Sequence, residues 1–190
     1  MLHGTKGGFL PNKYVKQGNR RKIPFFIFPL HPNFNITMIQ FTCLPFNQLT
    51  VYELYDIMAL RQEIFVVEQN CPYLDADGKD LHAWHLMGRN TEGVLVAYTR
   101  LLPMGVSYPD YASIGRVANS DKVRGQGMGK ILMQRSIEEM AQLFPNQPVK
   151  IGAQTYLLKF YTSLGFVSTG EEYLEDDIPH TTMILKSQNI

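Results

Sequence analysis

Three glycines stand at every second position of the segment Val123–Lys130, which reads Val-Arg-Gly-Gln-Gly-Met-Gly-Lys. A strand-like run precedes this segment, and a stretch with amphipathic helical periodicity follows it. Glycine has no Cβ and accepts positive φ, so backbone N–H groups can come close to an anion. The start of a helix adds unpaired N–H groups and the positive end of the helix dipole. The segment therefore predicts a strand–loop–helix unit that holds a pyrophosphate.

Two common phosphate-binding loops do not fit this segment. A Walker A loop requires Gly-x4-Gly-Lys-Ser/Thr, but Arg124 stands where the first glycine belongs and Ile131 replaces the hydroxyl residue. A dinucleotide fingerprint requires Gly-x-Gly-x-x-Gly, and its third glycine would fall on Lys130 or Leu132. The pattern therefore excludes a nucleoside triphosphate or dinucleotide site of either kind.

Composition indicates one globular domain and argues against nucleic acid as a partner. The chain has 190 residues, of which 45% are hydrophobic and 18% charged, enough for one sizeable core. The net charge of +1 is unevenly distributed, because residues 1–37 carry six Lys and Arg and no acidic residue. The remainder carries 12 Lys and Arg against 17 Asp and Glu, a net charge of −5, which does not suit a nucleic-acid partner.

Residues 1–37 are rich in Gly, Pro and Asn and show no sustained periodicity. We interpret them as a poorly ordered extension or as sequence upstream of a natural start at Met38, and residues 38–190 as the domain. A basic targeting peptide is the alternative, which the lack of a Ser-rich amphipathic pattern disfavours. No segment approaches the ~20 apolar residues of a membrane-spanning helix. Cys43 and Cys71 lack a framework spacing, which favours free thiols in the cytoplasm.

The domain is predicted to have an α+β fold with a mixed sheet. Thr50 and Glu53 form a capping box that begins a helix over 51–67, and a second helix runs over 128–144 after the glycine loop. A run of antiparallel strands leads into one strand–loop–helix–strand crossover. Gly115 predicts a bulge or a close ligand approach within its strand. The predicted strands cover 39–42, 83–87, 94–101, 112–119, 149–153, 166–168 and 181–185, with a short helix over 155–164.

The pattern Arg124-x-x-Gly127-x-Gly129 resembles the acetyl-CoA loop of the GNAT superfamily of N-acetyltransferases. Phe160–Phe166, which reads Phe-Tyr-Thr-Ser-Leu-Gly-Phe, resembles a later helix of the same superfamily. The resemblance spans Met38 to the C-terminus and implies a twisted, mostly antiparallel sheet with a V-shaped splay between its central strands and flanking helices. Five further segments are similar to the ElaA-type branch: Leu60–Gln69, Cys71–Tyr73 with Asp75 and Asp77, Ile114–Val117, Gly152–Gln154 and Ile178–His180.

The resemblance implies acetyl-CoA as the co-substrate and assigns residues to it. A backbone N–H near Val117 would polarise the thioester carbonyl, in the manner of an oxyanion hole. The pantetheine arm would lie along one strand edge, and the pyrophosphate in the glycine loop. The implied cofactor-binding residues are Val117, Ala118, Asn119, Arg124, Gly125, Gln126, Gly127, Met128, Gly129, Lys130 and Tyr161.

The resemblance also nominates residues for catalysis. Tyr161 is predicted to donate a proton to the leaving thiolate, although packing of its ring on the helix is the alternative. Glu68 is predicted as the base, with a solvated carboxylate at the helix end as an equal alternative and with His85, His180 and Glu172 as further candidates. Arg116, His85 and His180 are predicted to contact the acceptor. For His85, a structural histidine with satisfied ring nitrogens is the favoured alternative, and for His180 the alternative is an anchor for its loop. For Arg116, an ion pair with a carboxylate is an equal alternative.

The predicted function is transfer of an acetyl group from acetyl-CoA to an amine by direct attack. The alternative is the same fold acting as an acyl-CoA-binding or regulatory module with little turnover. The acceptor would be a small-molecule or peptide amine. The acidic loop over 75–80 suits a cationic amine, although a solvated acidic face explains the same charges. No membrane partner is expected, and a homodimer is left open.

Metal sites are not predicted. Asp75-x-Asp77-x-x-Asp80 departs from a Ca²⁺ loop because Lys79 and Asp80 occupy positions that require a ligand and a glycine. His82 and His85 lie three apart in a predicted strand, so their side chains would point to opposite faces.

Overall fold

The computed structural model describes residues 38–187, which form a seven-stranded sheet in the order β1-β2-β3-β4-β5-β7-β6. Neighbouring strands are antiparallel except β4 and β5, so the predicted mixed α+β fold is confirmed. The extension predicted over 1–37 lies outside the described residues, as do residues 188–190. The strands are β1 (Gln40–Pro45), β2 (Trp84–Arg89), β3 (Leu95–Leu102), β4 (Ala112–Asn119), β5 (Val149–Gln154), β6 (Val167–Glu175) and β7 (Ile178–Leu185).

The first helix, α1 (Val51–Arg61), begins at the predicted capping box. The backbone N–H of Glu53 donates to Thr50 Oγ1 at 3.1 Å, and the Thr50 N–H donates to the Glu53 carboxylate at 2.8 Å. Beyond Arg61 the helix widens into a π-helical segment over Gln62–Glu68. Ile64, Phe65 and Glu68 of this segment line the cleft described below, and π-helical turns are frequent near functional sites.

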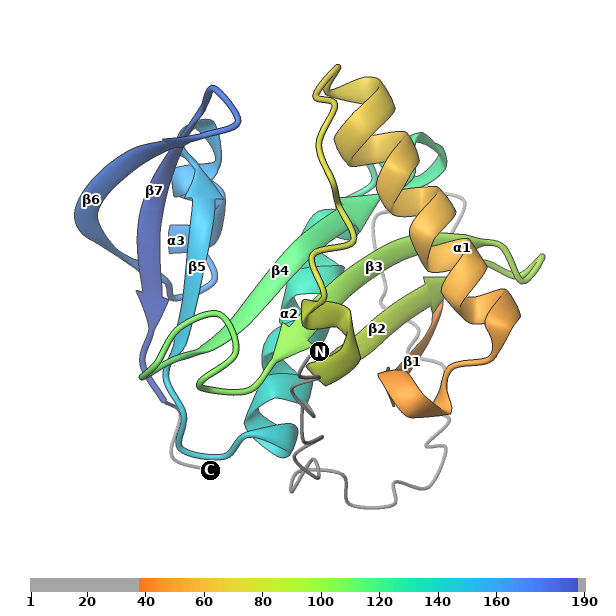
Figure 1. The fold of residues 1–190 in the computed structure, drawn as a ribbon, viewed down its shortest axis with the longest axis horizontal. Helices are drawn as coiled ribbons and strands as arrows, with labels where there is room; N and C mark the ends of the chain where they lie inside the picture. The colour runs from red at the N-terminus through yellow and green to blue at the C-terminus, as the bar shows by residue number, and fades with distance from the viewer. Residues whose placement is uncertain (1–37, 188–190) are drawn as a thin grey trace, which may run out of the picture.

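Helices cover both faces of the sheet. Figure 1 shows α1 in front of β2 and β3, with α2 (Met128–Leu143) behind β3 and β4 and α3 (Leu158–Thr162) behind β5. β3 is buried along its whole length because it is covered on both faces. Ile57, Leu60 and Tyr98 belong to the core on the α1 side, and Leu132 and Ile151 to the core on the α2 side. Within residues 38–187, no helix is long and apolar enough to cross a membrane.

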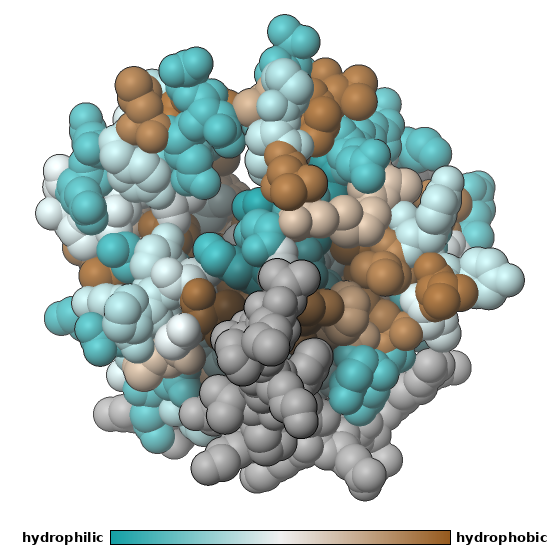
Figure 2. Space-filling view, in the orientation of Figure 1, coloured by the Kyte–Doolittle hydropathy of each residue, from teal (hydrophilic) through white to brown (hydrophobic). Residues whose placement is uncertain are grey.

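The sheet splays open between its two parallel strands. β4 and β5 pair only where Ala112 faces Val149 and Ser113 faces Lys150. Beyond these pairs the two strands diverge, and Figure 1 shows the V-shaped opening between β4 and β5. The space-filling view shows a hollow at this place, surrounded largely by hydrophilic side chains (Figure 2). The predicted splay is therefore present, and it leaves one edge of β4 without a strand partner.

Candidate functional site

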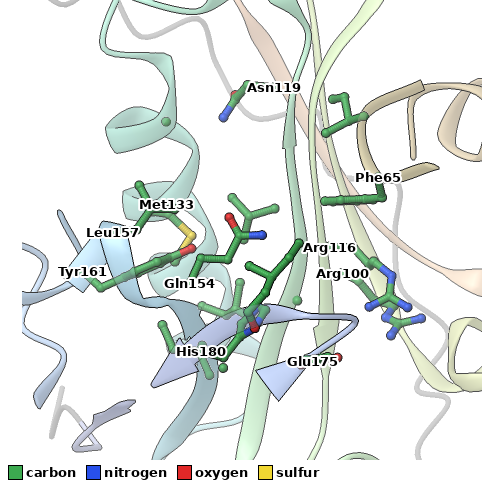
Figure 3. Close-up of a pocket in the computed structure, with 18 of the residues that line it drawn as sticks. Phe65, Arg100, Arg116, Asn119, Met133, Gln154, Leu157, Tyr161, Glu175 and His180 are labelled. Carbon is green, nitrogen blue, oxygen red and sulfur yellow. The ribbon is translucent and has the colours of Figure 1, made fainter. Parts of the chain in front are cut away.

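The splay opens into a cleft of about 990 Å³ that runs between the two halves of the sheet. Its walls come from the end of the first helix, β4, the glycine loop, β5, α3 and the β6–β7 hairpin. In Figure 3, Asn119 marks one end of the cleft, and His180 and Glu175 lie at the other, with Gln154 and Tyr161 between them. The cleft thus joins the glycine loop to side chains that lie far away in the sequence.

Backbone conformation explains the first two glycines of the loop. Gly125 has φ 74° and Gly127 has φ 76°, and Gly127 is the residue that caps the start of α2. A Cβ at either position would meet no atom within 4 Å, so the left-handed conformation, and not crowding, requires glycine there. The first-turn amides of α2 point into the loop because a helix leaves its first N–H groups unpaired. The loop therefore has the predicted backbone conformation, and its binding of a pyrophosphate stays a prediction.

β4 carries a bulge at the point where the splay opens. Arg100 faces Gly115 and Tyr98 faces Ala118, so Arg116 and Val117 together oppose the single residue Thr99. Arg116 has φ 53°, an uncommon conformation for a residue with a side chain. The bulge predicted at Gly115 is therefore present one residue later.

A buried carboxylate holds the bulge from the side of α1. Asp75 Oδ1 accepts a hydrogen bond from Arg116 Nε at 2.6 Å, and Asp75 Oδ2 accepts one from Arg61 Nε at 2.7 Å. Arg61 is fully buried at the end of α1 and Asp75 is 5% exposed. Burial alone would raise the pKa of Asp75, but the hydrogen bonds and charges of Arg61 and Arg116 hold that pKa below its usual value. Asp75 therefore remains ionised and joins the helix to the bulge.

The neighbouring aspartates extend this cluster. Arg100 donates to both carboxylate oxygens of Asp77, at 2.7 and 2.8 Å, and Arg61 donates to Asp80 at 2.7 Å. Burial would raise the pKa of Asp77, but its bonds with Arg100 lower the pKa to about 2. The loop over 75–80 is therefore not a solvated acidic face, because arginines bind its carboxylates, and its attraction for a cationic amine stays a prediction. Arg116 forms an ion pair with Asp75, which is the predicted alternative to contact with the acceptor.

Tyr161 lines the cleft from α3. Its side chain is 7% exposed and packs edge-on against Phe160 and Phe166, with ring centroids 5.1 and 5.9 Å away. Figure 3 shows the ring beside Met133 and Leu157. Burial, and secondarily Tyr156, raises the pKa of Tyr161 to about 12, so the phenol keeps its proton. The position and protonation state are compatible with the predicted proton donor.

Glu68 lies at the glycine loop, away from His180 and Glu175. Its carboxylate forms a 2.8 Å ion pair with Arg124, whose Nε donates to the Asn119 carbonyl at 2.9 Å. The end of the first helix is thereby tied to the loop. This position favours a role in shaping the pyrophosphate end of the cleft and does not favour the predicted role of base.

The structure does not support His85 as an acceptor contact. Its side chain is fully buried and lies outside the cleft lining. Nδ1 lies 2.8 Å from the Tyr98 hydroxyl and Nε2 lies 3.2 Å from the Asp80 carbonyl, so both ring nitrogens have partners. The carbonyl can only accept, which makes Nε2 the donor and the Tyr98 hydroxyl the donor to Nδ1. Burial is the main reason that the pKa of His85 falls to about 4, which keeps the ring neutral.

The remaining predicted residues occupy different parts of the cleft. Val117 and Asn119 line it, as do Arg124, Gly125, Gly127, Met128, Gly129, Lys130, Arg116 and His180. Ala118 is fully buried on the α1 side, so only its backbone can reach a ligand. Gln126 is outside the lining, and its side-chain amide donates to the Lys122 carbonyl. Glu172 is also outside the lining, in register with the buried Thr181.

Sequence reasoning missed the wall formed by β5 and the β6–β7 hairpin. Gln154, Tyr173 and Glu175 line the cleft there. The sequence predicts strands only over 166–168 and 181–185, whereas β6 and β7 extend to Glu175 and back from Ile178. The alternation of exposed residues along 171–175 is weak, because β6 is an exposed edge strand, so no periodic signal marks its second half.

Comparison with known proteins gives consistent results. A family model for the acetyltransferase (GNAT) domain matches residues 83–187. The protein ElaA of Escherichia coli is 43% identical over 149 residues, covering 77% of this chain and 95% of that protein. Its crystal structure matches with a TM-score of 0.73 at 40% identity, covering 78% of this chain and all of the other. An acyl-CoA N-acyltransferase from Pseudomonas aeruginosa matches with a TM-score of 0.73 at 44% identity, covering 77% of this chain and 99% of the other.

Removal of the buried carboxylate should destabilise the fold more than removal of a surface carboxylate. In Asp75→Asn, the guanidinium groups of Arg61 and Arg116 lose their shared partner, and breaking a buried pair costs about 3–5 kcal/mol. Asp56→Asn is the control, because Asp56 pairs with Arg89 at the surface and such pairs contribute roughly 0–1 kcal/mol. Urea unfolding of both variants measures the difference. Equal losses would contradict the central role of Asp75.

His85 should make the free energy of unfolding depend on pH between about 6.5 and 4. Its pKa is lower in the folded protein than the ordinary value of about 6.5, so its stabilisation is complete above pH 6.5 and is lost as the pH falls towards 4. The loss from this one group is on the order of 3 kcal/mol. His85→Gln should flatten the curve in this range relative to the exposed control His82→Gln. An unchanged slope in His85→Gln would contradict the assignment.

Proposed function

Because this chain belongs to the acetyltransferase (GNAT) family, in its ElaA-type branch, we propose that it transfers an acetyl group from acetyl-CoA to an amine. The observation that carries the proposal is the single cleft that joins the glycine loop, the unpaired edge of β4 and Tyr161. The Pseudomonas aeruginosa relative, described as an acyl-CoA N-acyltransferase, supports the same chemistry.

Three features of the cleft fit acetyl-CoA, which supplies an acyl group activated as a thioester. The left-handed glycines and the start of α2 offer N–H groups to a pyrophosphate, beside the charges of Arg124 and Lys130. The edge of β4 beyond Ser113 has no strand partner and offers peptide groups to the pantetheine amides. Asn119 Oδ1 is buried without a hydrogen-bond partner among residues 38–187, an arrangement that a ligand N–H would relieve.

Two groups of the chain would assist the chemistry. The bulge turns the backbone near Val117 towards the cleft, where its N–H would stabilise the negative charge that develops on the thioester oxygen. The acceptor nitrogen forms a bond to the acetyl carbon and the carbon–sulfur bond breaks. Tyr161, protonated at neutral pH, would give its proton to the departing sulfur and regain one from solvent.

We also propose the class of acceptor and the compartment in which the reaction takes place. The acceptor is an amine of a small molecule or a peptide, used in the cytoplasm, where Cys43 and Cys71 remain free thiols. Release of free thiol from acetyl-CoA across a panel of amines tests the activity. The second candidate, an acyl-CoA-binding or regulatory module, would give thermal stabilisation by CoA with no thiol release on any amine. No stabilisation by CoA would contradict both.

Gly127→Ala should weaken CoA binding because alanine is strained at φ 76°. A left-handed residue with a Cβ costs about 1–2 kcal/mol, which corresponds to roughly a tenfold rise in the Kd for CoA if the loop relaxes to a different shape. Gly93→Ala is the matched control, because Gly93 has φ 80°, open space around it and a position in the β2–β3 turn. Calorimetric titration with CoA measures both. Equal Kd values for the two variants would contradict the loop assignment.

Tyr161→Phe should lower kcat by about 10²-fold and leave CoA binding unchanged, because general acid catalysis contributes about 10²–10⁴. Tyr55→Phe is the control, since Tyr55 is 75% exposed on α1 and outside the cleft lining. Thiol release under saturating acetyl-CoA gives kcat, and the shift in Tm with CoA gives binding. Full activity in Tyr161→Phe would contradict the role of proton donor and leave Tyr161 with a packing role alone.

A further inference from the structure

Three side chains lie in one row across the β5–β7–β6 wall of the cleft. β7 lies between the other two strands, with His180 in register with Gln154 of β5 and with Tyr173 of β6. Residues directly opposite each other in antiparallel strands project from the same face of the sheet. All three line the cleft, so this face looks across the splay towards the bulge of β4. Figure 3 shows His180 and Gln154 on this side of the cleft and Arg116 on the β4 side.

The hydrogen bond of His180 fixes which ring nitrogen is available. Nδ1 lies 2.8 Å from the carbonyl oxygen of Ile178. A carbonyl only accepts, so Nδ1 carries the hydrogen, and in the neutral ring the lone pair is on Nε2. Among residues 38–187, Nε2 has no hydrogen-bond partner. His180 therefore presents a proton acceptor in the wall of the cleft.

Tyr173 holds the ring of His180 in this orientation. The two rings stack with centroids 5.7 Å apart and an interplanar angle of 23°. The stack depends on the absence of a side chain at Gly152, because a Cβ there would lie 2.1 Å from the Tyr173 hydroxyl oxygen. Gly152, Tyr173 and His180 thus form a packed unit that fixes the position of the histidine, while the Ile178 carbonyl fixes its tautomer.

The other bases assigned from the sequence, and Asp77, are occupied or absent from the cleft, whereas Glu175 lines it at the same end as His180. Glu68 is paired with Arg124 at the opposite end, and both ring nitrogens of His85 are bonded in the core. Glu172 lies outside the lining. Asp77 lines the cleft, but both of its carboxylate oxygens accept bonds from Arg100. His180 differs from all four because it combines a place in the cleft with an available lone pair.

We propose that His180 is the general base for the acceptor amine and that Tyr173 is its positioning residue, an inference that rests on the proposed amine acetylation. An amine bound as an ammonium ion must lose a proton before its nitrogen can attack a thioester. In this step the N–H bond of the ammonium breaks, a new N–H bond forms at His180 Nε2, and the electron pair stays on the amine. His180 later returns this proton to solvent. The nitrogen releases its second proton to solvent as the carbon–sulfur bond breaks, and solvent returns one proton to Tyr161 for the one that Tyr161 gives to sulfur.

The acceptor class follows from this assignment. A base is needed for an aliphatic amine, which is protonated at neutral pH, and is not needed for an amine that is already neutral. We therefore expect a primary aliphatic amine as the acceptor. An aromatic amine, neutral at the assay pH, becomes a diagnostic probe because its attack does not require proton removal beforehand.

The test compares His180→Ala and His180→Gln with the wild type in thiol release, using the best aliphatic amine of the panel. Both variants should lose about 10²-fold in kcat, the usual contribution of a general base, while the Tm shift caused by CoA stays unchanged. Imidazole should restore at least tenfold of the activity of His180→Ala and should not affect the wild type. With a neutral amine, the loss in both variants should be less than tenfold. His82→Ala, an exposed histidine outside the cleft lining, is the control and should keep full activity.

The contrary results distinguish a failure of the role proposed for His180 from a failure of the proposed function. Full activity in His180→Ala, or full activity in His180→Gln, would overturn the role of base, because glutamine keeps polarity and cannot take the proton. Equal losses with aliphatic and neutral amines, or a failure of imidazole to restore His180→Ala, would also overturn it. If the wild type itself releases no thiol with any amine, the proposed function fails instead. Tyr173→Phe should keep most of the activity, since the stacked ring remains, and Tyr173→Ala should lower kcat and leave the KM for acetyl-CoA unchanged.

Discussion

The ion pairs of Asp75 are the interaction on which the rest of the cleft depends. One buried carboxylate binds Arg61 at the end of α1 and Arg116 in the β4 bulge, 2.7 and 2.6 Å away. Arg116 occupies a left-handed conformation, which costs of order 1–3 kcal/mol and persists only where the surroundings hold it. The charge pair provides that support. The helix, the acidic loop and the bulge therefore form one rigid wall of the cleft.

The opposite wall is held by packing and sheet register. β4 and β5 share only two residue pairs, so the β5–β7–β6 half meets the rest of the sheet at the closed end of the V. On that half, register places Gln154, His180 and Tyr173 in a row. The two walls thus differ in physical character: arginine–aspartate pairs fix the side that carries the oxyanion-type backbone, and aromatic stacking fixes the side proposed to handle the acceptor.

The parts of the site that were predictable from the sequence are those set by local rules. The capping box at Thr50, the glycine loop and the bulge near Gly115 each depend on neighbouring residues, and all three are present. The ion cluster was not predictable, because Asp75 and Arg116 are 41 residues apart and charge alone does not specify a partner. His85 is the structural histidine that its place in a strand favoured, and its assignment to the acceptor was wrong because tertiary packing places both of its ring nitrogens in the core. The second half of β6 lacked a periodic signal.

Gly152 lets the shape of this cleft change at a residue that carries no side chain. The ring of Tyr173 occupies the volume that any side chain at 152 would need. Even the smallest replacement would displace the phenol, and with it the wall behind His180, while the fold of β5 and its pairing with β7 could be kept. The depth of the cleft on the side proposed for the acceptor therefore depends on which residue stands at position 152 of β5. In related chains, the residue at this position would be the first place to look for a different acceptor size.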